Sequence, residues 1–318
     1  PTRVSRRIEP SAYKDPRNDK EGLGGGGMSS YLEKIGRIRA HLALEGAAGA
    51  VLSTPDNVFY ATGFSSVMDG WHLVEPIAAV FVPTDAASPV ILILPEASVI
   101  SPIVSERGGH PVHFDRLATF DMLNFCETAR AEDAHLALPD DLLAELGDVM
   151  EQVEGQCEPD IIQTIAACVS RHISKAERVV FDDLRVAARV EALTGQASGD
   201  ALDVMFAARA VKTADELDTL RESGQIADAI MAYTVSLLGV GKSWSEVEKQ
   251  VAHFMIDHDV DPLPGSPMLF GGAYDLVFRP DLFRTPVSRP FEGGEIVILE
   301  TQGRYKNFWV DINRTAHI

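Results

Sequence analysis

Two uninterrupted apolar runs constrain the fold of this chain more than any other feature. They cover residues 77–82 and 90–94, and the turn residues Pro83, Thr84 and Asp85 follow the first run. A strand with one face in water alternates apolar and polar residues, whereas a strand covered on both faces is apolar throughout. The runs therefore predict central strands of a β-sheet with helices on both faces, which places the chain in the α/β class.

Other patterns upstream of residue 204 alternate between helix and strand. Leu32, Ile35, Ile38 and Leu42 recur every three or four residues, which predicts a helix with one buried face that Gly46 ends. Further expected elements are strands at 50–52, 136–138 and 178–181, helices near 141–153 and after 182–183, and a turn at 54–57 before an aromatic, β-branched stretch at 58–64. We therefore expect a layered α/β domain over residues 28–204, with a structural or substrate-gating role.

Residues 205–318 are expected to form a second domain of α+β type. Two capping boxes, residues 213–216 and 243–246, predict two helix starts. The first helix is expected to bury Leu217, Leu220, Ala227, Ile230 and Met231, and the second to bury Val247, Val251, Phe254 and Met255. Strand candidates at 295–300 and 307–313 then predict a closing β-hairpin.

Composition excludes several classes of protein. The chain has 318 residues, enough for two domains, and a formal charge of −19, which repels nucleic acid and anionic lipid. We therefore expect neither partner, and no apolar run reaches the roughly 20 residues of a membrane span. Cys126, Cys157 and Cys168 are interpreted as buried thiols of a cytoplasmic protein. Residues 1–27 are expected to be a disordered leader, with Met28 as the native start.

Glu300 and Asp311 are the most informative polar residues. If the hairpin is centred between Tyr305 and Lys306, the two carboxylates lie opposite one another on the same face. Two facing carboxylates repel, so the arrangement requires a proton, a cation or a basic partner, and hard divalent cations bind such oxygen ligands. Ordinary surface acids on an exposed hairpin are the alternative.

Three ordered motifs resemble the creatinase/prolidase/methionine-aminopeptidase (M24) family. Residues 294–315 are similar to its acidic hairpin, because Glu300 and Asp311 keep the family's interval of eleven positions and Arg314-Thr315 follow. Residues 210–221 resemble its K-x-x-x-E helix start, and residues 53–64 its N-domain signature S-x-x-N-(I/V)-x-Y-x-(S/T)-G-F.

The resemblance implies a creatinase-type N-terminal domain and a pita-bread catalytic domain that this chain carries only in its first half, truncated at the C-terminus. It implies a hydrolase of small C–N bonds, such as an Xaa-Pro dipeptidase or aminopeptidase. Glu300 and Asp311 would be the first two ligands of a divalent metal such as Mn, Co or Zn, and the full-length protein would be a homodimer acting on a dipeptide or another small molecule.

Three departures from the family pattern matter. Glu300 stands where the family has Asp, and a two-metal site tolerates ligand shifts of only a few tenths of an ångström. No His occurs between His258 and His317, and Arg279 occupies the approximate position of the family's substrate His, so Arg279 is expected to contact a substrate carboxylate instead. The family's remaining ligands, one His and two Glu, would lie beyond Ile318. The alternatives are a metal-independent, creatinase-like amidinohydrolase and a non-catalytic binding protein of the same fold.

Overall fold

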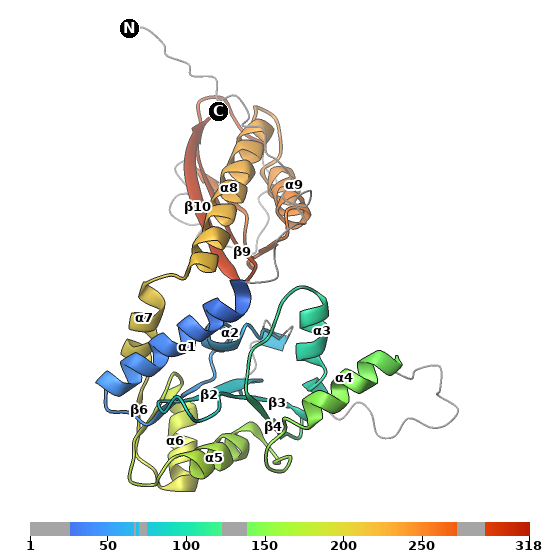
Figure 1. Ribbon diagram of the computed structural model, residues 1–318. Coiled ribbons are helices and arrows are strands. Elements are labelled where there is room, and N and C mark those ends of the chain that lie inside the picture. The colour runs from blue at the N-terminus through green and yellow to red at the C-terminus, as the bar shows by residue number, and fades with distance from the viewer. Residues whose placement is uncertain (1–25, 67, 70–74, 123–138, 272–289) are drawn as a thin grey trace. The chain divides into compact units, whose positions relative to one another are not determined.

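The computed structural model (Figure 1) describes residues 26–66, 68–69, 75–122, 139–271 and 290–318. Its contacts divide the described chain into two compact units that separate between Thr213 and Ala214. The sequence places this boundary earlier, between Val204 and Met205, and the helix that follows Ala201 belongs to the first unit. Each unit has its own hydrophobic core.

The first unit is built on a six-stranded sheet in the order β4-β3-β2-β1-β5-β6. Only β2 runs against its neighbours, so the other five strands point the same way. The predicted strands at 50–52, 77–82, 90–94 and 178–181 are all present and fully buried: β1 (Gly49–Leu52), β2 (Ala79–Pro83), β3 (Ile91–Pro95) and β5 (Val179–Phe181). The strands β4 (Arg116–Phe120) and β6 (Ser198–Asp200) were not predicted from the sequence. The strand predicted at 136–138 lies outside the described residues.

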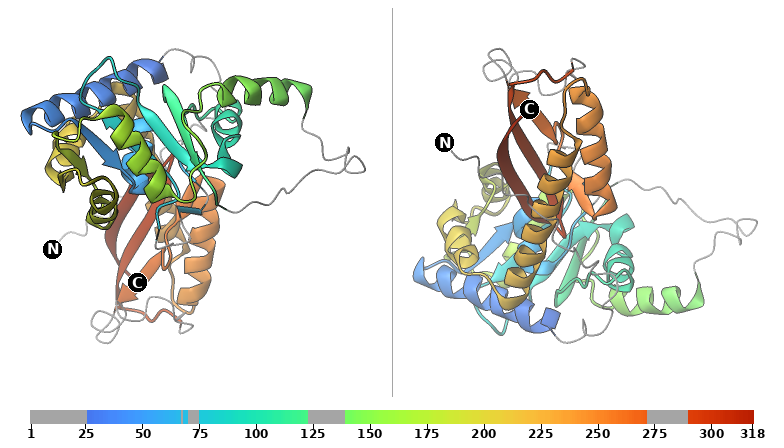
Figure 2. Two further views of the ribbon diagram at one scale, coloured as in Figure 1. Left: turned by 90° about the horizontal axis from the view of Figure 1, so that it is seen from below. Right: turned by 90° about the horizontal axis from the view of Figure 1, so that it is seen from above.

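Helices cover both faces of this sheet, which confirms the predicted α/β/α layers. Helices α1 (Gly26–Leu44), α2 (Pro55–Thr62) and α7 (Leu202–Ala210) pack on the face to which Ala50 and Leu52 point. Val51 points to the opposite face, where α5 (Ile161–His172) and α6 (Leu184–Thr194) cover the sheet (Figures 1 and 2). The described residues of the unit also form η3 (Glu96–Ser98), α3 (Ser101–Arg107) and α4 (Asp140–Met150), the last at the predicted position.

Two details of the predicted N-terminal elements are wrong. In α1 the buried face is formed by Tyr31, Ile35, Ile38 and Leu42, while Leu32 is 61% exposed. The expected turn at 54–57 is the first turn of α2, since Pro55 stands at its start, where a missing N–H costs nothing. Gly63 then ends this helix with φ 78°, and a Cβ there would lie 2.6 Å from the carbonyl oxygen of Pro111.

A single carboxylate binds three polar residues of the signature at 53–64, namely Ser53, Thr54 and Asn57. Asp182, directly after β5, accepts bonds from the backbone N–H and hydroxyl of Ser53, the backbone N–H and hydroxyl of Thr54, and the amide of Asn57. Arg209 of α7 in turn donates to the side-chain oxygen of Asn57. The signature therefore fixes the ends of β1 and β5 to the start of α2, and its polar part is structural.

We predict that Asp182→Asn destabilises the first unit strongly. The Asn side chain would turn an NH₂ group toward the N–H and O–H donors around it. A donor left without an acceptor, together with the loss of charge-assisted hydrogen bonds, lowers the free energy of unfolding by about 3 kcal/mol. Asp141→Asn is the matched control, because Asp141 is exposed and its ion pair with Arg107 is worth less than about 1 kcal/mol. Urea denaturation followed by circular dichroism measures both, and equal effects of the two changes would contradict the assignment.

In the described part of the second unit, residues 214–271 and 290–318, two helices pack against one face of an antiparallel sheet. Helices α8 (Ala214–Leu237) and α9 (Trp244–Asp257) cover strands β7 (Val260–Pro262), β8 (Met268–Gly271), β9 (Ile296–Tyr305) and β10 (Phe308–His317). β9 is central, with β10 on one side and both β7 and β8 on the other. This arrangement confirms the predicted partial α+β domain.

Two predictions about the helices of this unit are wrong. Leu217 is 41% exposed, because Glu216 and not Leu217 lies on the buried side of the first turn of α8. At the start of α9, the Ser243 side chain makes no capping bond to the backbone, and its hydroxyl lies 3.1 Å from that of Ser245.

No helix within the described residues combines the length and hydropathy of a membrane span.

Candidate functional site

The turn of the closing hairpin fixes the register of the acidic residues. Lys306 and Asn307 both have positive φ angles, 48° and 64°, so they form a two-residue turn of the kind that matches strand twist. Tyr305 and Phe308 are the closing pair. The predicted centre between Tyr305 and Lys306 is therefore wrong by one position, because Asn307 tolerates the left-handed conformation that the turn requires.

Glu300 and Asp311 consequently face carboxamides and not each other. Glu300 pairs with Asn313, and Asp311 pairs with Gln302. Because side chains alternate between faces, all four project from the same face of the ribbon, with the carboxylates on one diagonal and the carboxamides on the other. Residues on such a diagonal are about 7–8 Å apart. We call these four residues the oxygen-donor rectangle.

The rectangle lies on the sheet face that the helices leave open. Along β9, Val297, Leu299 and Thr301 are buried beneath α8 and α9, whereas the intervening residues are partly exposed. Glu300 is half-buried and Asp311 is exposed. Both carboxylates are therefore accessible to a ligand that approaches from the face opposite the helices.

Gln302 is a neighbour of both carboxylates, and it was not identified from the sequence. Its side-chain amide donates to Oε1 of Glu300 at 2.9 Å, while it lies opposite Asp311 across the strand pair. Its backbone N–H is held by the hydroxyl of Ser266 at 2.7 Å. Because successive side chains in a strand point to opposite faces, the sequence alone predicts that Gln302, two positions after Glu300, lies on the same face.

Contacts behind the rectangle hold the hairpin against the helices. The Tyr305 hydroxyl and the Lys306 ammonium both donate to Oε2 of Glu222 on α8, at 3.2 and 2.7 Å. Gly303 allows β7 to approach, since a Cβ at this position would lie 2.6 Å from Cγ1 of Val260. The hairpin tip is thus fixed from two sides, and the glycine of the acidic motif has a packing role.

The donor chemistry suits a hard divalent cation, although the set is incomplete. Two carboxylates and two carboxamide oxygens on one face are ligands of the type that Mg²⁺, Ca²⁺ and Mn²⁺ take. Within the described ranges, no three His, Cys, Asp or Glu side chains come together as a metal site. Glu300 and Asp311 therefore fit as part of a ligand set. Arg279, the predicted substrate contact, lies outside the described residues.

Comparison with known proteins gives one family and a consistent fold. Residues 218–318 match metallopeptidase family M24, a range that contains α9, the hairpin and most of α8. No curated protein matches the sequence.

Several solved structures similar to this chain are peptidases. A prolidase from Thermococcus sibiricus has 16% identity and a TM-score of 0.60 over 91% of this chain. An Xaa-Pro dipeptidase from Bacillus anthracis has 17% identity and a TM-score of 0.58 over 91%, and proline aminopeptidase P II from Yersinia pestis has 15% and 0.56 over 90%. This chain spans 65%, 65% and 63% of their respective lengths. At these identities the likeness establishes the fold, that of prolidases with an N-terminal domain and a pita-bread domain.

We predict opposite effects for two Gly→Ala changes in this unit. Gly303→Ala places a methyl group against Val260 and within 2.9 Å of the Asp261 carbonyl oxygen, and overpacking of this kind costs about 2 kcal/mol. Gly224→Ala meets nothing within 4 Å on the exposed side of α8, so it gains about 1 kcal/mol from helix propensity. Urea denaturation distinguishes them, and a neutral Gly303→Ala would show that β7 does not pack closely there.

Proposed function

We propose that the protein, whose residues 218–318 match metallopeptidase family M24, hydrolyses a small C–N bond with the help of a divalent metal. The substrate class is that of an Xaa-Pro dipeptidase or aminopeptidase. Glu300 and Asp311 bind the metal, which is Mn, Co or Zn. The supporting observation is that both carboxylates project from the open face of the sheet inside the matched segment.

The residues of the rectangle have separate roles in this proposal. A bound divalent ion supplies Lewis-acid polarisation and an activated water. Gln302 orients Glu300 through the bond to Oε1 and leaves Oε2 to the ion. Asp311, the more exposed carboxylate, would be the second ligand of the ion. The further ligands come from groups beyond the described residues, and Arg279 clamps a substrate carboxylate.

One observation favours a second candidate, a metal-independent hydrolase of the creatinase type. The Gln302 amide already satisfies one oxygen of Glu300. In that case both carboxylates bind a cationic amidine or amine of the substrate. A non-catalytic binding protein of the same fold would use the same face and show no turnover.

We extend the proposal to the setting of the protein. The family resemblance supports a homodimer, with the active site near the subunit interface, in the cytoplasm.

The three cysteines were predicted to be buried. Cys168 is buried, whereas Cys157 is exposed, which corrects the prediction, and Cys126 lies outside the described residues.

We predict that Mn²⁺ binds the protein through the rectangle. Glu300→Gln and Asp311→Asn each remove a charged ligand and are expected to weaken Mn²⁺ binding at least about 10-fold, since even an outer-shell partner contributes roughly 10–100-fold. Glu292→Gln is the control, because Glu292 is exposed on the segment before β9. Titration calorimetry measures binding to the metal-free protein. Unchanged affinity in both rectangle variants would overturn the metal role.

We predict that hydrolysis of Ala-Pro by the protein with Mn²⁺ depends on the same face. Proline release should fall at least about 100-fold in Asp311→Asn and about 10-fold in Gln302→Ala, because Gln302 acts by orienting Glu300. Chelator treatment should abolish the activity. Turnover of creatine that survives the chelator would support the second candidate, and binding without turnover of either substrate would support the binding protein.

A further inference from the structure

The open face of the ribbon carries a large aromatic side chain next to the oxygen-donor rectangle. Trp309 stands two positions before Asp311 on β10, so both side chains project from the same face. Strand residues two positions apart are separated by about 7 Å. The indole is therefore the neighbour of Asp311 on the side of the hairpin turn.

Trp309 is unusually exposed for a tryptophan. It is 52% exposed, whereas Trp244 of the same unit is fully buried. Tryptophan is highly buried on average, because its ring system carries a large apolar area. Within the described residues, the Trp309 side chain makes no hydrogen bond or ring contact. Its ring is therefore available to a ligand that approaches the open face.

The charges around Trp309 favour an uncharged ligand group. Arg304 lies directly opposite Trp309 on β9, and Asp261 of β7 lies opposite Arg304 on the other side. A divalent cation on the rectangle would offset the charges of Glu300 and Asp311. The charges that remain beside the indole then have opposite signs, so neither a cation nor an anion gains a clear advantage there. The indole itself offers apolar surface, which suits an aliphatic or aromatic group.

The other end of the rectangle offers less apolar surface. There Ile298 lies opposite Thr315 on one side and opposite Phe270 of β8 on the other. Ile298 and Phe270 are both half-buried, whereas Trp309 is exposed. Of the described apolar side chains that adjoin the rectangle on this face, Trp309 is thus the most accessible to a substrate.

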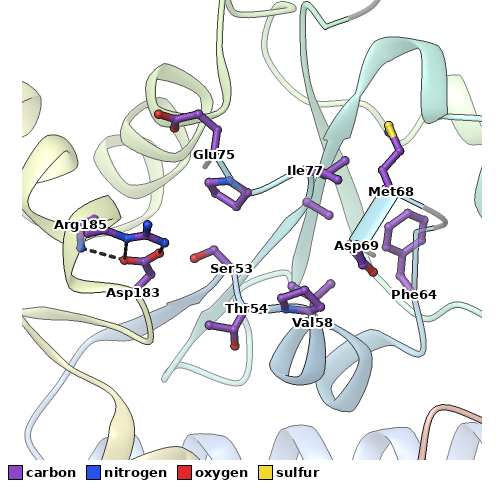
Figure 3. Close-up of a pocket in the computed structure, with 13 residues that line it drawn as sticks. Ser53, Thr54, Val58, Phe64, Met68, Asp69, Glu75, Ile77, Asp183 and Arg185 are labelled. Carbon is purple, nitrogen blue, oxygen red and sulfur yellow. Dashed lines mark hydrogen bonds and ion pairs between the residues drawn. The ribbon is translucent and has the colours of Figure 1, made fainter. Parts of the chain in front are cut away.

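The cavity of the first unit does not offer a comparable contact. It has a volume of about 240 Å³ and lies at the ends of β1 and β5 (Figure 3). Figure 3 shows Ser53, Asp69 and Glu75 on different sides of the cavity. Asp183 is engaged by Arg185. Because these polar groups do not converge on one point, the lining does not select a ligand.

The spacing on the ribbon decides which part of an Xaa-Pro dipeptide reaches the indole. In the proposed hydrolysis the reacting C–N bond lies at the carboxylates. The pyrrolidine ring extends two bonds beyond the reacting nitrogen, or about 2.5 Å, whereas a leucine side chain extends four bonds from the reacting carbonyl carbon, or about 5 Å. The distance of about 7 Å from Asp311 to Trp309 is therefore bridged more readily by a large Xaa side chain than by the proline ring.

We propose that Trp309 receives the side chain of the variable residue Xaa and makes the protein prefer large apolar residues at that position. This inference rests on the proposed Xaa-Pro hydrolysis, and it assigns substrate selection to a residue that is not a metal ligand. The contact removes apolar surface of the substrate and of the indole from water, which stabilises the complex in proportion to the area buried.

Leu-Pro and Gly-Pro test the preference in the presence of Mn²⁺. The unmodified protein is expected to cleave Leu-Pro with a kcat/KM at least about 10-fold above that for Gly-Pro, since a small apolar contact already discriminates roughly 10–200-fold. In Trp309→Ala this ratio should fall toward one, mainly through a higher KM for Leu-Pro, and Trp309→Phe should restore most of it.

Ile296→Ala is the matched control for this ratio. Ile296 is 54% exposed on the same face of the ribbon, but it lies beyond Ile298, at the end far from Trp309. The ratio is expected to stay unchanged in this variant. An unchanged ratio in Trp309→Ala, or an equal fall in Ile296→Ala, overturns the inference. A changed oligomeric mass of Trp309→Ala together with an unchanged ratio would overturn it as well, and would assign the indole to a protein interface.

Binding can be read without turnover from the indole N–H signals. The chain has three tryptophans, so Trp309→Phe identifies the signal of Trp309 in a ¹H–¹⁵N NMR spectrum. With Mg²⁺ in place of the paramagnetic Mn²⁺, Leu-Pro is expected to shift this signal saturably, and Gly-Pro to bind at least several-fold more weakly. A saturable shift without cleavage of either dipeptide in Mn²⁺ would contradict the proposed function and support the contact with Trp309. No saturable shift with Leu-Pro overturns the inference, whatever the activity.

Discussion

The two-residue turn at Lys306-Asn307 determines the chemistry of the second unit. It fixes ten cross-strand pairs between β9 and β10, and through them the face to which each side chain points. A slip of one residue would move Asp311 to the face packed against α8 and α9, where an unpaired carboxylate is costly. The Lys306 ammonium also reaches Glu222, so the turn both sets the register and attaches the ribbon to the helix.

This dependence explains how the observed pairing of the two carboxylates differs from the predicted one. The sequence centres the hairpin one position too early, which changes the partner of Glu300 from Asp311 to Asn313, a shift of two residues. Since faces repeat every two residues, an even shift exchanges neighbours and preserves the face. The carboxylates therefore lie together on one face but are not directly opposed. Their roles as metal ligands stay a prediction, as does the role of Arg279.

The predictable part of the fold is the part that depends on local burial. The continuous apolar runs of β2 and β3 predict strands buried on both faces, and these strands are buried. The apolar spacing of Ile35, Ile38 and Leu42 likewise predicts the buried face of α1. The errors arise where a distant partner decides. Leu32 has the correct spacing for the buried face, but Tyr31 occupies it and stacks on His113. The bonds of Ser53, Thr54 and Asn57 to Asp182 span more than a hundred residues of sequence, so the motif by itself reads as a turn.

Asp182 on one side, and Glu300 with Asp311 on the other, differ in the number of hydrogen bonds that they accept. Asp182 accepts five bonds from a single segment, so both of its oxygens are satisfied within the protein, and it stabilises the junction of β1, β5 and α2. Glu300 accepts a side-chain bond from Gln302, and Asp311 is exposed beside that same amide. Because two negative charges on one open face repel unless a cation lies between them, their proximity costs free energy in the absence of a ligand. A protein that keeps such a pair on a rigid ribbon has the geometry for binding a cation there, whether the cation is a metal ion or the charged group of a substrate.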